Sequence, residues 1–340
     1  MNSSRVEDDI VNNIDEKYLI DTLVSLAKIP TNVPLGAEVF MEPDDPKLLK
    51  YVQGVLKPKI LDLGVDTLTD VPRNQLLVKM GNGDIGNSLI LMAYTPTQHH
   101  NLMQDPFSGK IADGEKWGYN EKCVFGQGVT QNKAHQAILM SIIKLLIDQE
   151  VELSGTLYIA INNEGRSSHE CSSSILNSLD SKPLFGIILC NTGLRLSLGN
   201  RGRVDVNVEI RGEVCHSSAP KIGLSAIDGA QRAMEKLKLL HSSLESKGSH
   251  PLLGKRHAIV YQLLFDPIAP HTLPEIARMR IDRRLLPGDD PDQAVKEVRD
   301  TLSDMHPYEV NVSRGECMLP ALVDPEIPIL SVLRNAHKAV

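Results

Sequence analysis

Four groups of polar side chains in this sequence follow short apolar runs that have the length of buried strands. They are Tyr94 with His99 and His100, the glycine-rich segment that leads to Gln131, the pair Asn163 and Glu164, and Cys190. Ligands of α/β proteins bind beyond the carboxyl ends of the strands, so these groups are expected to meet at one rim of a sheet. Phenol, imidazole, carboxylate and thiol groups at one rim can transfer protons or bind a metal ion.

Each group also has an ordinary structural interpretation. Asn and Gly after a strand commonly form a turn, and a histidine pair in a polar loop is more often solvated than bound to a ligand. Cys190 ends an apolar run and is predicted to be a buried, unreactive thiol. The segment Gly81–Gly86 matches GxGxxG, but a strand is predicted to follow it, so a hairpin turn is expected instead of a dinucleotide site. No GxSxG motif of a serine hydrolase occurs.

The elements that position these groups predict an α/β domain. Short apolar runs at Ser88–Tyr94, Leu157–Asn162 and Phe185–Cys190 are typical of strands that are buried on both faces. Residues Gln131–Gln149 have helical periodicity. Because strands alternate with helices, the sheet is predicted to be mostly parallel.

Beyond Gly199 the pattern changes to alternating apolar and polar residues, as at Val204–Glu209 and Ala277–Arg283, which predicts half-buried antiparallel strands. An amphipathic helix is predicted at Ala226–Leu240. This part is interpreted as an inserted α+β lid. The predicted domains are residues 1–198 for the α/β domain, 199–314 for the lid, and 315–340 for the start of a return to the first domain, which is expected to be truncated.

Composition excludes several classes of protein. The 340 residues carry a formal charge of −7, with 41% apolar and 23% charged residues, so wholesale disorder is excluded and a nucleic-acid partner is disfavoured. No apolar run is long enough to cross a membrane, and the polar N-terminal residues do not resemble a signal peptide. Five scattered cysteines favour a reducing compartment, so we expect a cytoplasmic protein without membrane or nucleic-acid partners.

Several short motifs then appear in a familiar order. They are Leu89–Met92, Asp105–Phe107, Gly126–Gly128 with Lys133, Asn163–Glu164, Gly199–Gly202, His216–Ser218 with Pro220, Pro274, and Asp282–Pro287. In this order the chain resembles the M20 metallopeptidases and deacylases, which include acetylornithine deacetylase, succinyl-diaminopimelate desuccinylase and carboxypeptidase G2. The resemblance implies a zinc-peptidase-like α/β domain with a mostly parallel sheet, and an inserted α+β lid that forms a homodimer.

The metal ligands that the resemblance implies are mostly replaced. The family binds two zinc ions through an HxD motif, a bridging Asp, a Glu-Glu pair, a later acid and a late His. Tyr94-Thr95-Pro96 stands at the HxD position, Gln131 at the bridging Asp, and Cys190 at the later acid. Asn163-Glu164 replaces the Glu-Glu pair, so an amide occupies the position of the general base, and the late His has no counterpart before the end of the chain. Neutral groups cannot offset the charge of two zinc ions.

Two functional interpretations remain open. The first is a hydrolase of an amide or N-acyl C–N bond in a small substrate that carries a carboxylate. Its candidate residues are His216, Asn163 and Tyr94 for catalysis, Arg201, Asn200, His99, His100 and Gln131 for substrate binding, and Glu164 and Cys190 for one Zn or Mn ion. His216 would stabilise an oxyanion, and Arg201 would hold the carboxylate. The second is a catalytically inert M20-like protein that binds a small ligand or a partner.

Overall fold

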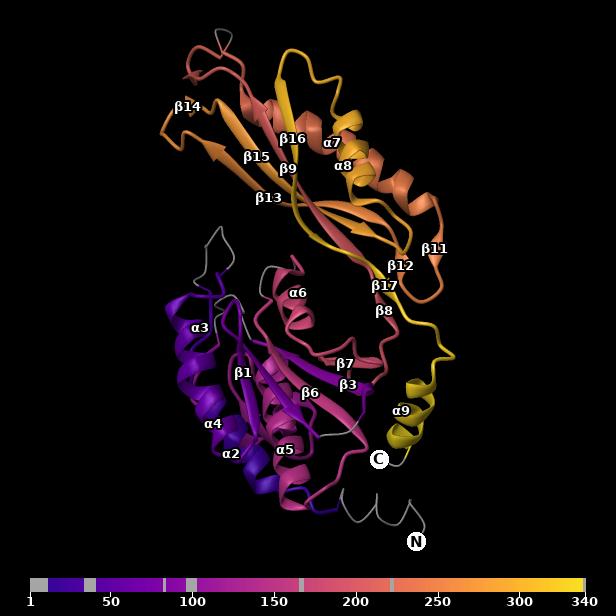
Figure 1. The fold of residues 1–340 in the computed structure, drawn as a ribbon. Helices are drawn as coiled ribbons and strands as arrows, with labels where there is room; N and C mark the ends of the chain where they lie inside the picture. Colours follow the sequence, from indigo (N-terminus) through magenta and orange to yellow (C-terminus); the bar gives the residue numbers. More distant parts are fainter. Residues whose placement is uncertain are drawn as a thin grey trace. The chain divides into compact units, whose positions relative to one another are not determined.

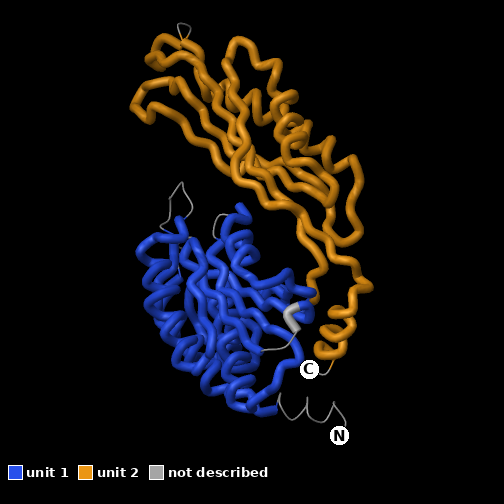
Figure 2. The backbone as a smooth tube through the Cα atoms, in the orientation of Figure 1, with its two compact units in different colours: residues 1–195 blue, residues 196–340 orange. Residues whose placement is uncertain are grey.

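The computed structural model describes residues 12–33, 41–81, 84–95, 103–164, 168–220 and 223–338. The chain divides into two compact units, residues 1–195 and 196–340 (Figure 2). The predicted return of residues 315–340 to the first domain stays a prediction. No helix in the described ranges is both long and apolar enough to span a membrane, and the expected cytoplasmic location remains a prediction.

Unit 1 is built on a five-stranded mixed sheet with the order β1-β2-β6-β3-β7 (Figure 1). The strands are β1 (Thr67–Val71), β2 (Gln75–Met80), β3 (Asp84–Tyr94), β6 (Gly155–Asn162) and β7 (Phe185–Leu189). β3 runs parallel to both β6 and β7, whereas β2 is antiparallel to β1 and to β6. The parallel character is therefore confined to β6, β3 and β7. Strand β3 follows Gly81, as predicted, whereas a dinucleotide-binding motif would be followed by a helix.

Helices cover both faces of the central strands, which explains their apolar runs. Leu91 and Ala93 of β3 pack against one face together with helices α2 (Glu16–Ala27), α3 (Pro46–Tyr51), α4 (Lys57–Leu61) and α5 (Ala134–Asp148). Ile90 and Met92 point the opposite way, toward Ile175 of α6 (Glu170–Asn177). Successive residues of a strand face opposite sides, so a strand between two helical layers must be apolar at every position. A small hairpin, β4 (Lys110–Asp113) and β5 (Lys122–Phe125), precedes α5.

The expectation that Phe185–Cys190 is buried on both faces, with Cys190 as a buried thiol, is wrong. β7 is an edge strand that pairs only with β3 among the described strands, and its burial alternates along its length. Ile187 and Leu189 pack against the core, whereas the side chain of Ile188 is 51% exposed. Cys190 is exposed as well. An apolar composition alone does not distinguish an edge strand from a central one.

Unit 2 is a four-stranded antiparallel sheet with the order β13-β15-β9-β16. Its strands are β9 (Gly202–Arg211), β13 (His257–Asp266), β15 (Ile276–Leu285) and β16 (Glu309–Met318). Helices α7 (Ala226–Ser246) and α8 (Pro291–Thr301) pack on one face, where Val204, Val206 and Val208 are buried. The predicted alternation is confirmed, because the intervening residues of β9 lie on the face without helices.

Short elements extend unit 2 at both ends of the sheet. β8 (Gly199–Asn200) pairs with β17 (Ala321–Leu322), and helix α9 (Pro328–Lys338) follows. At the other end of β9, β10 (Cys215–His216) pairs with β14 (Thr272–Leu273) (Figure 1). A further pair, β11 (Ser249–His250) and β12 (Gly254–Lys255), joins α7 to β13.

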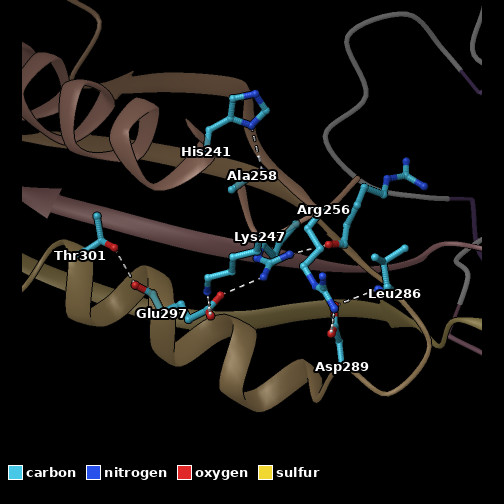
Figure 3. Close-up of polar contacts among 10 residues, drawn as sticks. His241, Lys247, Arg256, Ala258, Leu286, Asp289, Glu297 and Thr301 are labelled. Carbon is cyan, nitrogen blue, oxygen red and sulfur yellow. Dashed lines mark hydrogen bonds and ion pairs between the residues drawn. The ribbon is translucent and has the colours of Figure 1, made fainter. Parts of the chain in front are cut away.

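A network of charged side chains connects the helices of unit 2 to its sheet (Figure 3). Glu297 of α8 accepts hydrogen bonds from Lys247 at the end of α7 (3.1 Å) and from Arg283 of β15 (2.8 Å). Arg256 forms two hydrogen bonds with the carboxylate of Asp289, at 2.7 and 2.8 Å. The guanidinium of Arg283 is almost fully buried, so its pairing with Glu297 is the part of this network that bears on stability.

Candidate active site

The parallel strands of unit 1 bring three of the four predicted polar groups to one edge. Tyr94 of β3 lies beside Asn162 of β6, and Ala93 lies beside Leu189 of β7. Tyr94, the Asn163–Glu164 pair and Cys190 therefore leave the sheet at the same end. His99 and His100 lie outside the described residues, so their place relative to this edge stays a prediction.

Tyr94 has the environment of a phenol that keeps its proton. Burial raises the pKa of its hydroxyl, and the nearby Glu164 carboxylate and Cys190 thiol raise it further. Negative charge near a phenol disfavours the phenolate. At neutral pH Tyr94 can donate a hydrogen bond or a proton, but it cannot act as a base.

Glu164 is surrounded by donors from the start of α6. Its Oε1 accepts hydrogen bonds from the backbone N–H and the hydroxyl of Ser168, both at 3.2 Å. Its Oε2 accepts the N–H groups of Cys171 (2.9 Å) and Ser172 (3.4 Å). A carboxylate has about four acceptor positions. All of them are in use here, which leaves none directed at the open edge.

Asn163 occupies the interior and not the open rim. Its side chain is only 1% exposed, and Nδ2 donates to the carbonyls of Pro43 (2.9 Å) and Arg73 (3.5 Å). Its backbone N–H donates to Oε1 of Gln75 at 3.2 Å. Oδ1 is buried and accepts no hydrogen bond from the described residues. The amide connects β6 to two loops that are distant in sequence, which is a structural role.

Gln131 lies at an irregular entrance to α5. It is exposed, and it belongs to a π-helical segment, Val129–Lys133, in which Asn132 has a φ of 85°. A non-glycine residue in this left-handed region costs free energy, and such strain often accompanies functional sites. Gln131 is thus accessible for the predicted binding role, which stays a prediction.

Lys133 follows this segment, and sequence reasoning assigned it no role in the site. Its side chain is fully buried, and Nζ donates to the carbonyls of Ile29 (2.7 Å) and Ala27 (3.5 Å) at the end of α2. The aromatic rings of Tyr51 and Phe107 lie 5.9 and 5.4 Å from the ammonium. Burial lowers the pKa of Lys133 to about 8, because no described carboxylate compensates for the lost hydration.

Lys133→Met is expected to change how stability depends on pH. Between pH 8 and 10.5 the unfolded chain holds a proton on Lys133 that the folded chain has released, so raising the pH favours the folded state. The free energy of unfolding of the wild type should therefore rise over this range by about 3 kcal/mol relative to Lys133→Met. Urea unfolding at pH 7.5 and 10 measures the difference. Lys122→Met, which removes an exposed ammonium, is the control, and a constant difference between wild type and Lys133→Met would contradict the prediction.

Arg201 and Asn200 lie at one end of the unit 2 sheet. Nδ2 of Asn200 donates to the carbonyls of Arg201 (3.1 Å) and Leu319 (3.3 Å), which holds β8 in place. Arg201 donates to the carbonyl of Lys255 at 3.1 Å. Burial lowers the pKa of the neighbouring His257, and the positive charge of Arg201 lowers it further. The charges of Arg201 and Arg284 lower the pKa of His257, and the carboxylate of Asp282 opposes them.

His216 lies at the other end of β9, and its ring orientation is defined. Its Nδ1 accepts the backbone N–H of Ser218 at 3.2 Å and lies 2.8 Å from the hydroxyl of the same residue. An accepting Nδ1 places the proton of the neutral ring on Nε2. The side chain is exposed, and its ring stacks on that of His271 with centroids 6.0 Å apart. His216 thus presents an N–H donor to the surroundings.

The described residues do not fit a two-zinc centre. No group of three or more His, Cys, Asp and Glu side chains in the described ranges could hold a metal ion. Glu164 is saturated by hydrogen bonds, Asn163 is buried, and Cys190 lies at the exposed end of an edge strand. Burial also raises the pKa of Cys171 to about 12, so this thiol is not a thiolate ligand either.

Comparison with known proteins supports the resemblance. Residues 198–309 match the model of the M20 peptidase dimerisation domain. The Escherichia coli K12 protein YgeY is 25% identical over 256 residues, which cover 74% of this chain and 60% of YgeY. Acetylornithine deacetylase of Pectobacterium atrosepticum is 21% identical over 268 residues, which cover 76% of this chain and 67% of that enzyme. The chain thus spans about three fifths of the length of YgeY.

Solved structures share the fold. The M20 family metallo-carboxypeptidase Sso-CP2 of Sulfolobus solfataricus has a TM-score of 0.72 at 14% identity, with 94% of this chain and 83% of that chain covered. At such low identity the similarity establishes the fold and not the chemistry.

Proposed function

Since the chain has the fold of the M20 peptidases and carries their dimerisation domain, we propose that it hydrolyses a C–N bond in a small amide or N-acylated substrate with a carboxylate. The proposal rests chiefly on the hydrogen bonding of His216. Its Nδ1 accepts the backbone N–H of Ser218, so the proton of the neutral ring lies on the exposed Nε2, which can donate a hydrogen bond. Such a donor stabilises the oxyanion that forms when water attacks an amide carbonyl. The guanidinium of Arg201, whose charge lowers the pKa of His257, supports binding of the carboxylate.

The proposed roles of Arg201 and His216 require two chains. β9 separates them within one lid, and its ten residues span about 30 Å at 3.3 Å per residue. One small molecule cannot contact both residues of the same lid. A homodimer, in which one lid supplies His216 and the partner supplies Arg201, removes this difficulty. We therefore propose that the homodimer is the active form.

The proposed reaction uses no metal-dependent step, because the described residues do not fit a zinc or manganese centre. Arg201 would hold the substrate carboxylate, and His216 would donate to the developing oxyanion. The catalytic role predicted for Tyr94 stays a prediction, and its hydroxyl, which keeps its proton at neutral pH, can act as a hydrogen-bond donor.

His216→Ala is expected to lower kcat about 100-fold with a smaller change in KM, because the donor acts mainly on the transition state. The measurement is a screen of N-acetyl and N-succinyl amino acids and dipeptides with wild-type protein, followed by kinetics on any substrate found. His337→Ala, in helix α9, serves as the control and should match the wild type. Unchanged kcat in His216→Ala would remove His216 from the mechanism.

A second candidate function is ligand binding without catalysis. The buried Asn163 favours it, because an amide stands where the resemblance implies a general base and cannot accept a proton. Saturable binding of N-acetyl amino acids by calorimetry, without turnover of any compound in the screen, would favour this candidate over hydrolysis.

A further inference from the structure

We infer that the side chain of Glu164 caps the N-terminus of helix α6 and is not a metal ligand, so that the described part of the unit 1 edge closes without a metal ion. The resemblance implies the opposite for this residue, since Glu164 is the carboxylate retained from the metal-binding set. The inference holds or fails whether or not the chain is a hydrolase.

Helix α6 needs a cap at its N-terminus. The first N–H groups of a helix have no partner within the helix. His169 occupies the cap position of α6, but its side chain makes no capping hydrogen bond and its φ is 64°. Glu164 reaches the helix from the preceding loop and accepts the N–H groups of Cys171 and Ser172. The negative charge also interacts favourably with the helix dipole at this end.

A set of buried amide side chains completes this edge of the sheet. Gln75 of β2 donates from Nε2 to the carbonyls of Pro72 (2.8 Å) and Cys171 (3.0 Å). Asn162 donates to the hydroxyl of Ser172 at 2.9 Å and accepts the N–H of Glu164 at 2.7 Å. Gln75 and Asn162 are fully buried.

These amides connect β2, β6 and α6 in the region where the family carries clustered carboxylates. Clustered carboxylates need cations to offset their charge, whereas hydrogen-bonded amides can be buried without a counter-ion. A metal ion at Glu164 would have to displace four hydrogen bonds and remove the cap of α6. The chain has thus converted a ligand position into a structural contact.

Amide hydrogen exchange of the full chain tests the capping role. Glu164→Gln loses acceptor capacity at one of its two terminal atoms, so the Cys171 and Ser172 amides are expected to exchange about tenfold faster than in the wild type. Glu170→Gln is the matched control, because Glu170 lies in the first turn of the same helix and is ion-paired with Arg73 at 2.6 Å. It should leave both amides within about twofold of the wild-type rate. Equal exchange in Glu164→Gln and wild type would overturn the inference.

Calorimetric titration with ZnCl2 and MnCl2 tests the metal side. We expect either no stoichiometric binding or binding that Glu164→Gln leaves unchanged. One-to-one binding that weakens tenfold or more in Glu164→Gln would overturn the inference. If Glu164→Gln does not fold, exchange of the wild type with and without ZnCl2 decides the question. Zinc held by Glu164 would accelerate exchange at Cys171 and Ser172, whereas the capping role predicts no change.

Discussion

Replacing Asn163 by glutamate, the residue type that the M20 resemblance implies at this position, is expected to destabilise the protein by about 3–5 kcal/mol at pH 8. Asn163 is 1% exposed, and its Nδ2 donates to two backbone carbonyls. A carboxylate at this position would face those carbonyl oxygens without a proton to share. Ionisation of a buried carboxyl is costly, so the pKa of the introduced carboxyl in the folded variant should lie well above the usual glutamate value near 4.3.

The loss of stability in Asn163→Glu should depend on pH. Above the ordinary pKa the unfolded chain releases the proton, whereas the folded chain retains it up to the raised pKa. The folded state then binds more protons, so its stability falls as the pH rises through this window. At pH 4 the carboxyl is mostly neutral in both states, and only the changed packing and hydrogen bonding remain.

Urea unfolding of wild type and variant at pH 4 and 8 measures this effect. Asn163→Leu is the control, because it removes the same hydrogen bonds without adding an ionisable group, and its loss should be equal at both pH values. A loss in Asn163→Glu that does not depend on pH would contradict the prediction. Restoration of Asn163→Glu to wild-type stability by ZnCl2 would show that the edge can hold a metal once a second carboxylate is present.

The sequence predicts the central parts of both units well, because periodicity reports directly on burial. Leu91 and Ile90 are adjacent in β3 and pack into opposite cores, so an uninterrupted apolar run correctly indicates a strand between two layers. Val206 and Val208 are buried against helices and Asn207 between them is partly exposed, so alternation correctly indicates a half-exposed sheet. In both cases the local pattern and the tertiary environment agree.

The candidate site is less accessible to sequence reasoning, because its contacts are non-local. Asn163 bonds to Pro43, which is 120 residues away, and to Gln75, which is 88 residues away. No spacing rule connects these positions. Glu164 illustrates the same limit over a short distance, since its partners lie seven and eight residues further along the chain, at a spacing that no local rule predicts. The residue type of Glu164 indicated a metal ligand, whereas its hydrogen-bond partners indicate that it caps helix α6.

Arg201 and His216 show how one strand can change a functional hypothesis. They are fifteen positions apart in the sequence, close enough to suggest one binding site. An extended β9 of ten residues places them at opposite ends of the sheet instead. The alternating pattern that predicts β9 also predicts the distance between Arg201 and His216, because each residue of a strand advances the chain by about 3.3 Å.

Arg283→Met is expected to destabilise the protein by about 3 kcal/mol at pH 7, because it removes a buried guanidinium that donates to Glu297 and to the carbonyl of Arg284. The Arg283 side chain is 3% exposed and donates to Glu297 at 2.8 Å. Burial raises the pKa of Glu297, but the hydrogen bonds from Arg283 and Lys247 outweigh burial and hold it below its usual 4.5. Methionine retains most of the apolar stem and Glu297 keeps its bond to Lys247, so the loss reports chiefly on the hydrogen bonds of the guanidinium.

The matched control acts on the same carboxylate from its exposed side. Lys247 is 50% exposed and also bonds to Glu297, so Lys247→Met should cost less than about 1 kcal/mol. The stabilisation that Arg283 confers is present above the usual pKa of Glu297 and is lost as the pH falls through the lowered folded value. Denaturant unfolding of both variants and of Arg283→Met/Glu297→Gln at pH 7 and 3.5 tests this. Equal losses for Arg283→Met and Lys247→Met would contradict the prediction, because Arg283 is buried and makes a second hydrogen bond to the carbonyl of Arg284, whereas Lys247 is half exposed. In the double variant the loss should no longer depend on pH between 7 and 3.5, because residue 297 no longer titrates.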